Sequence, residues 1–357
     1  MRPSPASSDT VREWQLSRVT RWPRIRALCW QERSLYASRG YTLLRIEPED
    51  SASKWSVVGR FNPAWWRRLT SLGRLTYRLC RDGFHFLVVL PSGHIAGAVA
   101  GAIVTLAPGD DEFRMSHTVC RGTRPLGIAA TPDGGLYWGE YFQNHRRDEV
   151  HIYGSRDKGA TWDVVYTFPK GAIRHVHNIV YDKWDDCLWI LTGDEGTECN
   201  VIRASCDWNQ VDFVLSGNQQ ARAVAIVPTE QALYFASDTP LEANHVYRME
   251  RSGAFVHVGR TSGSSIYGCR AGDALFFSTM VEPSDVNLDR NVRLYGSLDG
   301  TSWRPLLEWQ KDAWPTPFQY GNASLPSGDN DTDLLALTCV AVEESDLETT
   351  VWRVPRY

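Results

Sequence analysis

Residues 155–162 read Ser155-Arg156-Asp157-Lys158-Gly159-Ala160-Thr161-Trp162, an unbroken Ser-x-Asp-x-Gly-x-Thr-Trp pattern. Short Ser and Asp side chains bond nearby backbone amides in turns, and Gly supplies a positive φ without steric cost. A Trp at the end of such a turn offers a large ring for burial. The octapeptide therefore predicts a tight turn closed by a Trp that packs between neighbouring sheets.

The pattern returns twice, as Ser297-Leu298-Asp299-Gly300-Thr301-Ser302-Trp303 and in a reduced form as Ser205-Cys206-Asp207-Trp208. It resembles the Asp box, or BNR repeat, of the sialidase-like β-propellers, where it fills the turn between the third and fourth strands of a blade. The resemblance implies a structural role, remote from the chemistry, for Ser155, Asp157, Gly159, Trp162, Ser297, Asp299 and Trp303.

A second repeat is a short segment in which a Leu follows a small or equivalent residue and precedes aromatic residues. Its Leu positions are 101, 52, 45 and 42 residues apart, and the first gap covers two periods: Leu35, Leu136, Leu188, Leu233 and Leu275. A period of about 40–50 residues with several short strands is typical of propeller blades. The sequence thus predicts an all-β fold, a β-propeller of four-stranded antiparallel blades. Seven blades fit 357 residues better than six, which remain possible.

We expect residues 1–357 to form one propeller domain. The last blade, from Asn322, looks short, and the segment Glu13–Thr20 is expected to complete it and close the ring, which removes exposed sheet edges. The Leu spacing after Trp65-Trp66 predicts a short inserted helix, and helix should otherwise be scarce.

Composition excludes several classes of function. The net charge of −4 gives no basic footprint for nucleic acid or an anionic membrane, and no apolar run reaches the roughly 20 residues of a membrane span. The first residues have no apolar stretch typical of a secretory signal. Eight Cys without a Cys-x-x-Cys pair favour free thiols in a reducing cytoplasm.

Blade geometry predicts where a site would lie. The start of the first strand and the end of the second meet on one face of a blade, so polar residues recurring there converge on one axial mouth. The candidate catalytic residues are Glu140, His177, Asp194, Asp238, Glu282 and Tyr320. The candidate substrate-binding residues are Arg124, Arg174, His175, Arg222, Glu242 and Gln319. Strand alternation places His175 and His177 on one side and Arg174 on the other.

Similarity to sialidases implies that Arg124, in Arg-Pro-Leu before the first Asp box, grips a substrate carboxylate. It also implies that Tyr320 acts as a nucleophile with Glu282 or Asp238 as its base. The sialidase motif is Arg-Ile-Pro and those enzymes have six blades, so sialidase activity itself is disfavoured.

Arginines beside carboxylates suit hydrolysis of an acidic saccharide, or lyase chemistry in which His177 or Tyr320 removes a proton beside a uronate carboxylate. We therefore predict a carbohydrate-active enzyme with a saccharide as partner. The alternative is a non-catalytic propeller that binds a glycan or protein. No cofactor is predicted, although His175 and His177 could hold a divalent metal. An enzyme should show its acid and base groups across a closed-bottomed axial pocket, whereas a binding platform should pair each carboxylate with an Arg of the next blade.

Overall fold

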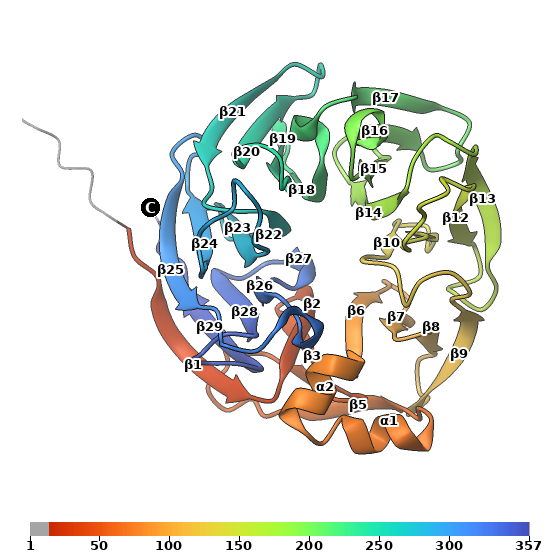
Figure 1. The fold of residues 1–357 in the computed structure, drawn as a ribbon. Coiled ribbons are helices and arrows are strands. Elements are labelled where there is room, and N and C mark those ends of the chain that lie inside the picture. Colours follow the sequence, from red (N-terminus) through yellow and green to blue (C-terminus); the bar gives the residue numbers. More distant parts are fainter. Residues whose placement is uncertain (1–13, 357) are drawn as a thin grey trace, which may run out of the picture.

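The computed structural model describes residues 14–356, and within them the strands form seven four-stranded antiparallel blades around a central axis (Figure 1). Strands hold 51% of the residues and helices 6%. The prediction of a β-propeller with little helix is confirmed.

Each blade is a meander whose first strand is innermost. The first two blades are β2 (Arg26–Glu32), β3 (Ser34–Arg39), β4 (Thr42–Ile46) and β5 (Ser56–Phe61), then β6 (Phe84–Val89), β7 (Ile95–Val99), β8 (Ala102–Leu106) and β9 (Glu112–Thr118). The third and fourth are β10 (Ala129–Ala130), β11 (Leu136–Gly139), β12 (Val150–Ser155) and β13 (Asp163–Phe168), then β14 (His175–Asp182), β15 (Cys187–Gly193), β16 (Asn200–Ser205) and β17 (Val211–Ser216). The fifth and sixth are β18 (Ala223–Pro228), β19 (Ala232–Ser237), β20 (His245–Glu250) and β21 (Phe255–Arg260), then β22 (Ser265–Ala271), β23 (Ala274–Val281), β24 (Asn291–Ser297) and β25 (Arg304–Gln310).

The seventh blade joins the two ends of the described chain. It contains β26 (Gly321–Ser324), β28 (Leu334–Val340) and β29 (Glu348–Arg353), and its outer strand is β1 (Ser17–Pro23). β1 pairs antiparallel with β29 from Ser17↔Arg353 to Pro23↔Glu348. The strand is shifted toward the C-terminus relative to the expected Glu13–Thr20, and Glu13 lies outside the described residues.

The repeated Leu lies on the second strand of its blade in every case. These side chains are 0–5% exposed: Leu35, Leu136, Leu188, Leu233 and Leu275. Burying a Leu side chain stabilises a fold by about 1.5–3 kcal/mol. The repeated Leu therefore marks a buried second strand that stabilises its blade.

The Asp boxes form the expected turns between third and fourth strands. Ser155 Oγ donates to Asp157 at 2.8 Å, and the Gly159 and Thr161 amides donate to Ser155 Oγ and Asp157. The second copy repeats the Ser297–Asp299 bond at 3.0 Å before β25, and the reduced copy repeats the Ser–Asp bond at 2.6 Å before β17.

The Trp of the first Asp box packs between neighbouring sheets as expected, although its side chain is only partly buried. Its indole Nε1 donates to Ser116 Oγ of β9 at 3.1 Å, and its ring meets Trp138 edge-on. Trp162 therefore ties the third blade to the second at the rim.

One strand of the described chain lies outside the seven blades. This is β27 (Ser327–Asn330), between β26 and β28 in the chain, which pairs in parallel with the end of β2 from Cys29↔Ser327 to Glu32↔Asn330. It also contacts β6 and β22, and Asp329 lies 3.2 Å from Lys183 Nζ in the turn after β14. One segment thus contacts blades one, two, four and six at the ends of their first strands. β27 therefore lies beside the central axis, at the end of the channel where the Asp-box turns are (Figure 1).

The insertion between β5 and β6 contains two helices, α1 (Trp65–Thr70) and α2 (Arg74–Cys80), instead of the single helix expected. Ser71-Leu72-Gly73 separates them, and Gly73 precedes α2 as its N-cap. Buried Arg78 fixes α2 to the seventh blade through Asp312 at 2.5 Å and the Phe318 carbonyl at 2.7 Å. Three short 3-10 helices complete the described elements: η1 (Gly196–Glu198), η2 (Gln219–Ala221) and η3 (Thr316–Phe318).

Two further expectations concern residues 14–356. No helix in this range is long and apolar enough to cross a bilayer. All eight Cys lie in the same range and none of them forms a disulfide, which agrees with the expected free thiols.

Candidate functional site

Asp194, which follows β15 directly, is the centre of a cluster at the mouth opposite the Asp boxes. Arg174 Nη1 donates to Asp194 Oδ2 at 2.8 Å. Two imidazole nitrogens face the other oxygen, with His175 Nε2 and His177 Nε2 lying 3.5 and 3.3 Å from Asp194 Oδ1. Arg222 of the fifth blade donates to the Asp194 carbonyl at 3.1 Å and has its Nη2 3.4 Å from Oδ1. The pairing of β14 with β15 and the packing of the fifth blade against the fourth therefore join four predicted basic residues to one predicted carboxylate.

The arrangement of the histidines depends on a β-bulge. The pairing of β14 with β15 shifts between Val176 and Asn178, which leaves His177 without a partner. Bulges re-aim side chains next to functional sites. Arg174 lies before the strand begins, so the expectation that it points away from the histidines is wrong, because all three side chains reach Asp194.

Asp238, which follows β19, lies in the next blade and is 5% exposed. Burial raises the pKa of Asp238 to about 7, with Glu282 and Asp194 adding to the rise and Arg222 opposing it. Arg222 Nη2 is 3.6 Å from Asp238 Oδ2, and Asp238 Oδ1 is buried without a hydrogen-bond partner in the described structure. The group is therefore poised to hold a proton at neutral pH.

Glu282 and Tyr320 link the sixth and seventh blades beside this pair. Burial raises the pKa of Glu282, and the nearby Arg222 and the hydrogen bond to Tyr320 oppose the rise. The pKa of Tyr320 is raised as well, first by burial and then by the Glu282 charge. Burial raises the pKa of Tyr141 to about 12, with Asp194, Asp238 and Glu282 adding to the effect. One phenol therefore lies within electrostatic reach of all three carboxyl groups.

Arg124 belongs to the same mouth, but its surroundings are cationic. Burial, together with the charges of Arg26 and Arg81, lowers the pKa of Arg124 to about 10. His85, the bulged residue of β6, has its pKa lowered by burial and by the same arginines. Sequence reasoning missed Arg26, Arg81 and His85. The repeat could have found Arg26, which precedes Arg124 by 98 residues just as Arg222 follows it by 98.

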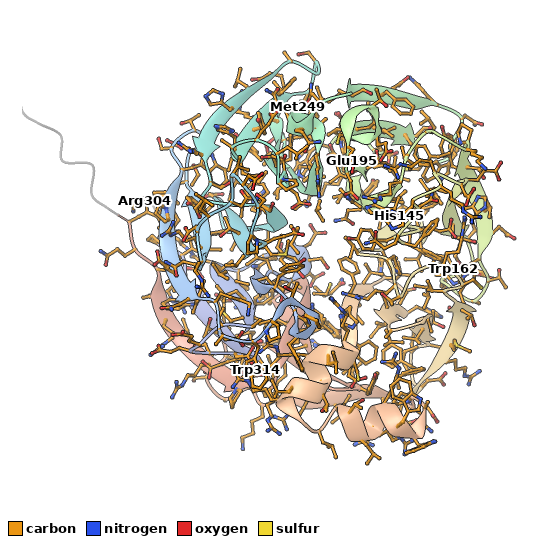
Figure 2. The ribbon with its side chains drawn as sticks, in the orientation of Figure 1. His145, Trp162, Glu195, Met249, Arg304 and Trp314 are labelled. Carbon is orange, nitrogen blue, oxygen red and sulfur yellow. The ribbon has the colours of Figure 1, made fainter. Side chains whose placement is uncertain are left out.

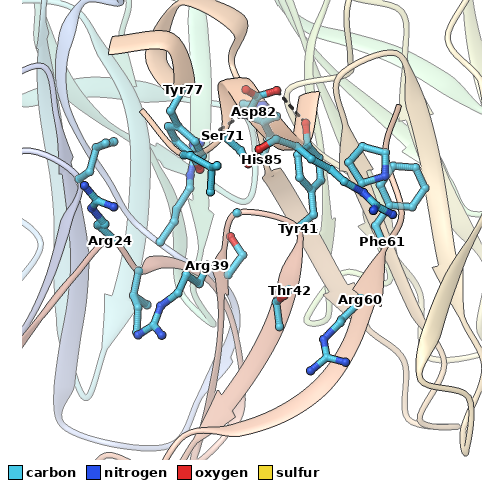
Figure 3. A pocket seen from close by; sticks show the side chains of 18 of the residues that line it. Arg24, Arg39, Tyr41, Thr42, Arg60, Phe61, Ser71, Tyr77, Asp82 and His85 are labelled. Carbon is cyan, nitrogen blue, oxygen red and sulfur yellow. Dashed lines mark hydrogen bonds between the residues drawn. The ribbon is translucent and has the colours of Figure 1, made fainter. Parts of the chain in front are cut away.

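A cavity of about 710 Å³ opens beneath the helices α1 and α2, beside these residues. Figure 3 shows Arg24, Arg39 and Arg60 along one side of it and Tyr77, Asp82 and His85 along the other. Six arginines line it in all: Arg24, Arg26, Arg39, Arg60, Arg68 and Arg74. Its acids are Asp111, Glu112 and Asp82, and the last is engaged by Arg67 at 3.0 Å and Tyr41 at 2.8 Å. The cavity is thus a second cationic surface, adjacent to the mouth through Arg26 and His85.

Three predicted site residues lie apart from the Asp194 cluster. The Glu140 carboxylate bonds with Arg121 and with the His151 amide, so it is fully engaged next to its own strand. Glu242 is exposed and acts on the pKa of His245 and Tyr247 instead.

Gln319 donates to the Arg78 carbonyl at 2.9 Å and lines the cavity beneath the helices. Glu195, next to Asp194 and labelled in Figure 2, has a side chain that is 67% exposed and faces Arg147 at 3.7 Å. Neighbours of a site residue in sequence therefore do not share its position in the mouth.

The chain matches no protein-family model and no curated protein sequence. Three solved structures resemble it over nearly all of both chains. A chain in the crystal structure of the Mitotic Checkpoint Complex has 12% identity and a TM-score of 0.60, covering 100% of this chain and 97% of that one.

An oligogalacturonate lyase from Vibrio parahaemolyticus has 10% identity and a TM-score of 0.58, with 98% and 96% covered. The WD40 β-propeller domain of Doa1 has 8% identity and a TM-score of 0.55, with 96% and 98% covered. At these identities the likeness shows the β-propeller fold alone.

Proposed function

We propose that this propeller binds and cleaves an acidic, carboxylate-bearing saccharide at the axial mouth, as a glycoside hydrolase or a lyase. The observation that carries the proposal is the convergence of Arg222 with two carboxyl groups whose pKa burial raises, those of Asp238 and Glu282, beside Tyr141, whose pKa the Arg124 charge also affects. The arginines suit a substrate carboxylate because a guanidinium makes paired charge-assisted bonds to it.

The division of roles follows from protonation. Asp238, with a pKa of about 7, holds a proton that it can donate to the leaving glycosidic oxygen. Glu282, which shares a hydrogen bond with Tyr320, is the candidate for the opposite function, a base or nucleophile in hydrolysis or a proton acceptor in elimination. Asp194 positions both guanidinium groups, because its carboxylate accepts a bond from Arg174 and its backbone carbonyl accepts one from Arg222.

One further feature supports a substrate that is long and anionic. The arginine-lined cavity beneath α1 and α2 extends the cationic surface sideways, so that it could hold the neighbouring sugar units of an oligosaccharide. We also propose membership of the Asp-box superfamily and a reducing, cytoplasmic location, on the three turns and the free thiols.

A non-catalytic glycan- or protein-binding propeller is the second candidate. It is favoured by the Asp194–Arg222 contact, which joins the fourth and fifth blades as a structural ion pair would, and by the complete engagement of Glu140. In that case Asp238 and Glu282 would be buried acids of the rim without a chemical role.

Incubation with neutral and uronate-containing oligosaccharides, followed by mass spectrometry, separates the candidates. Products that gain water indicate a hydrolase, and unsaturated products indicate a lyase. Asp238→Asn and Glu282→Gln should each lower turnover by about 10²–10⁴-fold, as loss of a general acid or base does. Glu242→Gln, an exposed acid, is the matched control and should leave it unchanged. Binding without any cleavage across the panel would favour the second candidate.

A further inference from the structure

His175 and His177 present the same ring nitrogen to Asp194 because backbone carbonyls fix the other one. His175 Nδ1 donates to the Phe142 carbonyl at 2.9 Å, and His177 Nδ1 donates to the Ala223 carbonyl at 2.9 Å. A carbonyl oxygen only accepts, so in each ring Nδ1 carries the hydrogen. In the neutral rings both Nε2 lone pairs then face Asp194 Oδ1, and three acceptors meet at one point.

Such a meeting of acceptors is unfavourable unless a cation lies among them. The cation that faces Oδ1, Arg222 Nη2, is 3.4 Å from it, which is longer than the about 2.7–3.2 Å of an N–H···O hydrogen bond. Charged imidazolium groups are a poor solution, because their bonds to a carboxylate are about 2.7–2.9 Å long, whereas the contacts measure 3.5 and 3.3 Å. His175 Nε2 is buried and has no hydrogen-bond partner in the described structure. Both histidines are 2% exposed, so water is not freely available to either ring.

The distances match those between ligands of one metal ion. Zinc lies about 2.0–2.2 Å from His nitrogen and carboxylate oxygen in a tetrahedral site, which separates its ligand atoms by about 3.3–3.6 Å. The His175–Asp194 and His177–Asp194 contacts fall in this range, and the three ligand atoms all lie within 4.8 Å of one another. The Nδ1–carbonyl bonds are the second-shell contacts that orient metal-binding histidines.

We infer that His175 Nε2, His177 Nε2 and Asp194 Oδ1 bind one divalent transition-metal ion of the zinc class at the axial mouth. Arg174 donates to Asp194 Oδ2, and Arg222 Nη2 stays 3.4 Å from Oδ1, so Oδ1 is the oxygen that ligates the ion. Two imidazoles and one carboxylate favour zinc over magnesium, which prefers oxygen ligands throughout. The described residues supply three ligands, so one position stays open to water or a substrate oxygen.

A second group of ligand-type residues shows what a metal site requires. Asp182, Asp185 and Cys187 also lie within ligand distance of one another. Arg251 bonds Asp182 and lies 3.1 Å from Asp185, and Trp189 Nε1 donates to Asp182 at 3.1 Å. Protein donors already satisfy these carboxylates, so they carry no metal inference.

The test uses the full chain, freed of metal by a chelator and titrated calorimetrically with ZnCl₂. It needs no saccharide, so its result is independent of the proposed function. We expect one equivalent to bind and Mg²⁺ at the same concentration not to bind. His175→Gln and His177→Gln should each weaken Zn²⁺ binding at least about 100-fold, at or beyond the upper end of what loss of a second-shell partner costs.

The double variant His245→Gln/His257→Gln is the matched control. In the wild type the ring centroids of His245 and His257 are 5.2 Å apart, and those of His175 and His177 are 5.0 Å apart. The double variant should bind Zn²⁺ as the wild type does. Failure of the wild type to bind, or equal loss in the control, would overturn the inference.

If both single variants fail to fold, the visible spectra of the Co²⁺-loaded wild type and of Co²⁺-loaded Asp194→Asn test the site instead. Intense bands of a four- or five-coordinate ion that are absent from Asp194→Asn support the site. The weak spectrum of hydrated Co²⁺ contradicts it.

Discussion

Replacing Asp238 by Asn should stabilise the protein, and by an amount that grows with pH. In the unfolded chain the Asp pKa is 3.8, whereas burial raises the pKa of folded Asp238 to about 7. Between these values the unfolded state has released the proton and the folded state retains it, so stability falls as the pH rises through the interval. Above pH 7 the full cost of ionising the buried group is present.

The magnitude follows from 1.36 kcal/mol for each unit of pKa difference. The destabilisation by Asp238 is about 1.5 kcal/mol at pH 5 and about 4 kcal/mol at pH 8. Asn has nearly the same shape and cannot ionise, so Asp238→Asn should recover most of this difference. The weak 3.6 Å contact with Arg222 is the main interaction that it forfeits.

Urea unfolding of both proteins at pH 5 and pH 8, followed by Trp fluorescence, measures the gain directly. Asp312→Asn is the control of opposite sign. Burial raises the pKa of Asp312, but the bonds from Arg78 and Lys311 outweigh it and lower the pKa, so this variant should lose stability at pH 8. If Asp238→Asn is no more stable than the wild type at pH 8, or gains equally at both pH values, the placement of a buried, protonated acid at the mouth is refuted.

Three other outcomes are expected. Gly159→Ala should destabilise by about 1–3 kcal/mol, because Gly159 has φ of 87° and an added Cβ would lie 2.7 Å from Thr105; an unchanged melting temperature would show that the Asp-box turn is not so constrained. Arg78→Met should lower the free energy of unfolding, measured in urea, by about 3–5 kcal/mol because it leaves Asp312 buried without its main partner. Arg114→Met, which removes an exposed ion pair, should change that free energy by no more than about 0.5 kcal/mol. Tyr320→Phe should lower turnover of the saccharide about 10²–10⁴-fold with little change in its binding, and a matching loss of both would mean that the hydroxyl only holds the ligand.

Sequence periodicity was sufficient to predict the blades and most of the mouth. The Leu of each second strand marks a buried layer, and equivalent positions in successive blades must converge once the ring closes, which is why Arg174, Arg222 and Asp194 meet. The same reasoning failed for Glu140, because its partner Arg121 lies in an irregular loop whose path no repeat encodes.

Contacts distant in sequence were also beyond prediction. β27 reads Ser-Gly-Asp-Asn, without the alternation of apolar residues that marks a strand, and its pairing with β2 joins residues about 300 positions apart. The cavity depends on how α1 and α2 dock onto the first and seventh blades through Asp82 and Arg78, which their own sequence does not reveal.

The central claim is that arginines remote in sequence act on one anionic saccharide. Calorimetric titration with a galacturonate trisaccharide tests it most directly, with the neutral galactose trisaccharide as the uncharged counterpart. Arg26→Gln, Arg124→Gln and Arg222→Gln come from different blades, and each should weaken binding of the charged ligand at least about 10-fold, which is 1.4 kcal/mol. Arg114→Gln, with a side chain 82% exposed on β9, should bind like the wild type. Equal binding of the charged and neutral ligands, or three arginine variants indistinguishable from the wild type, would contradict the account.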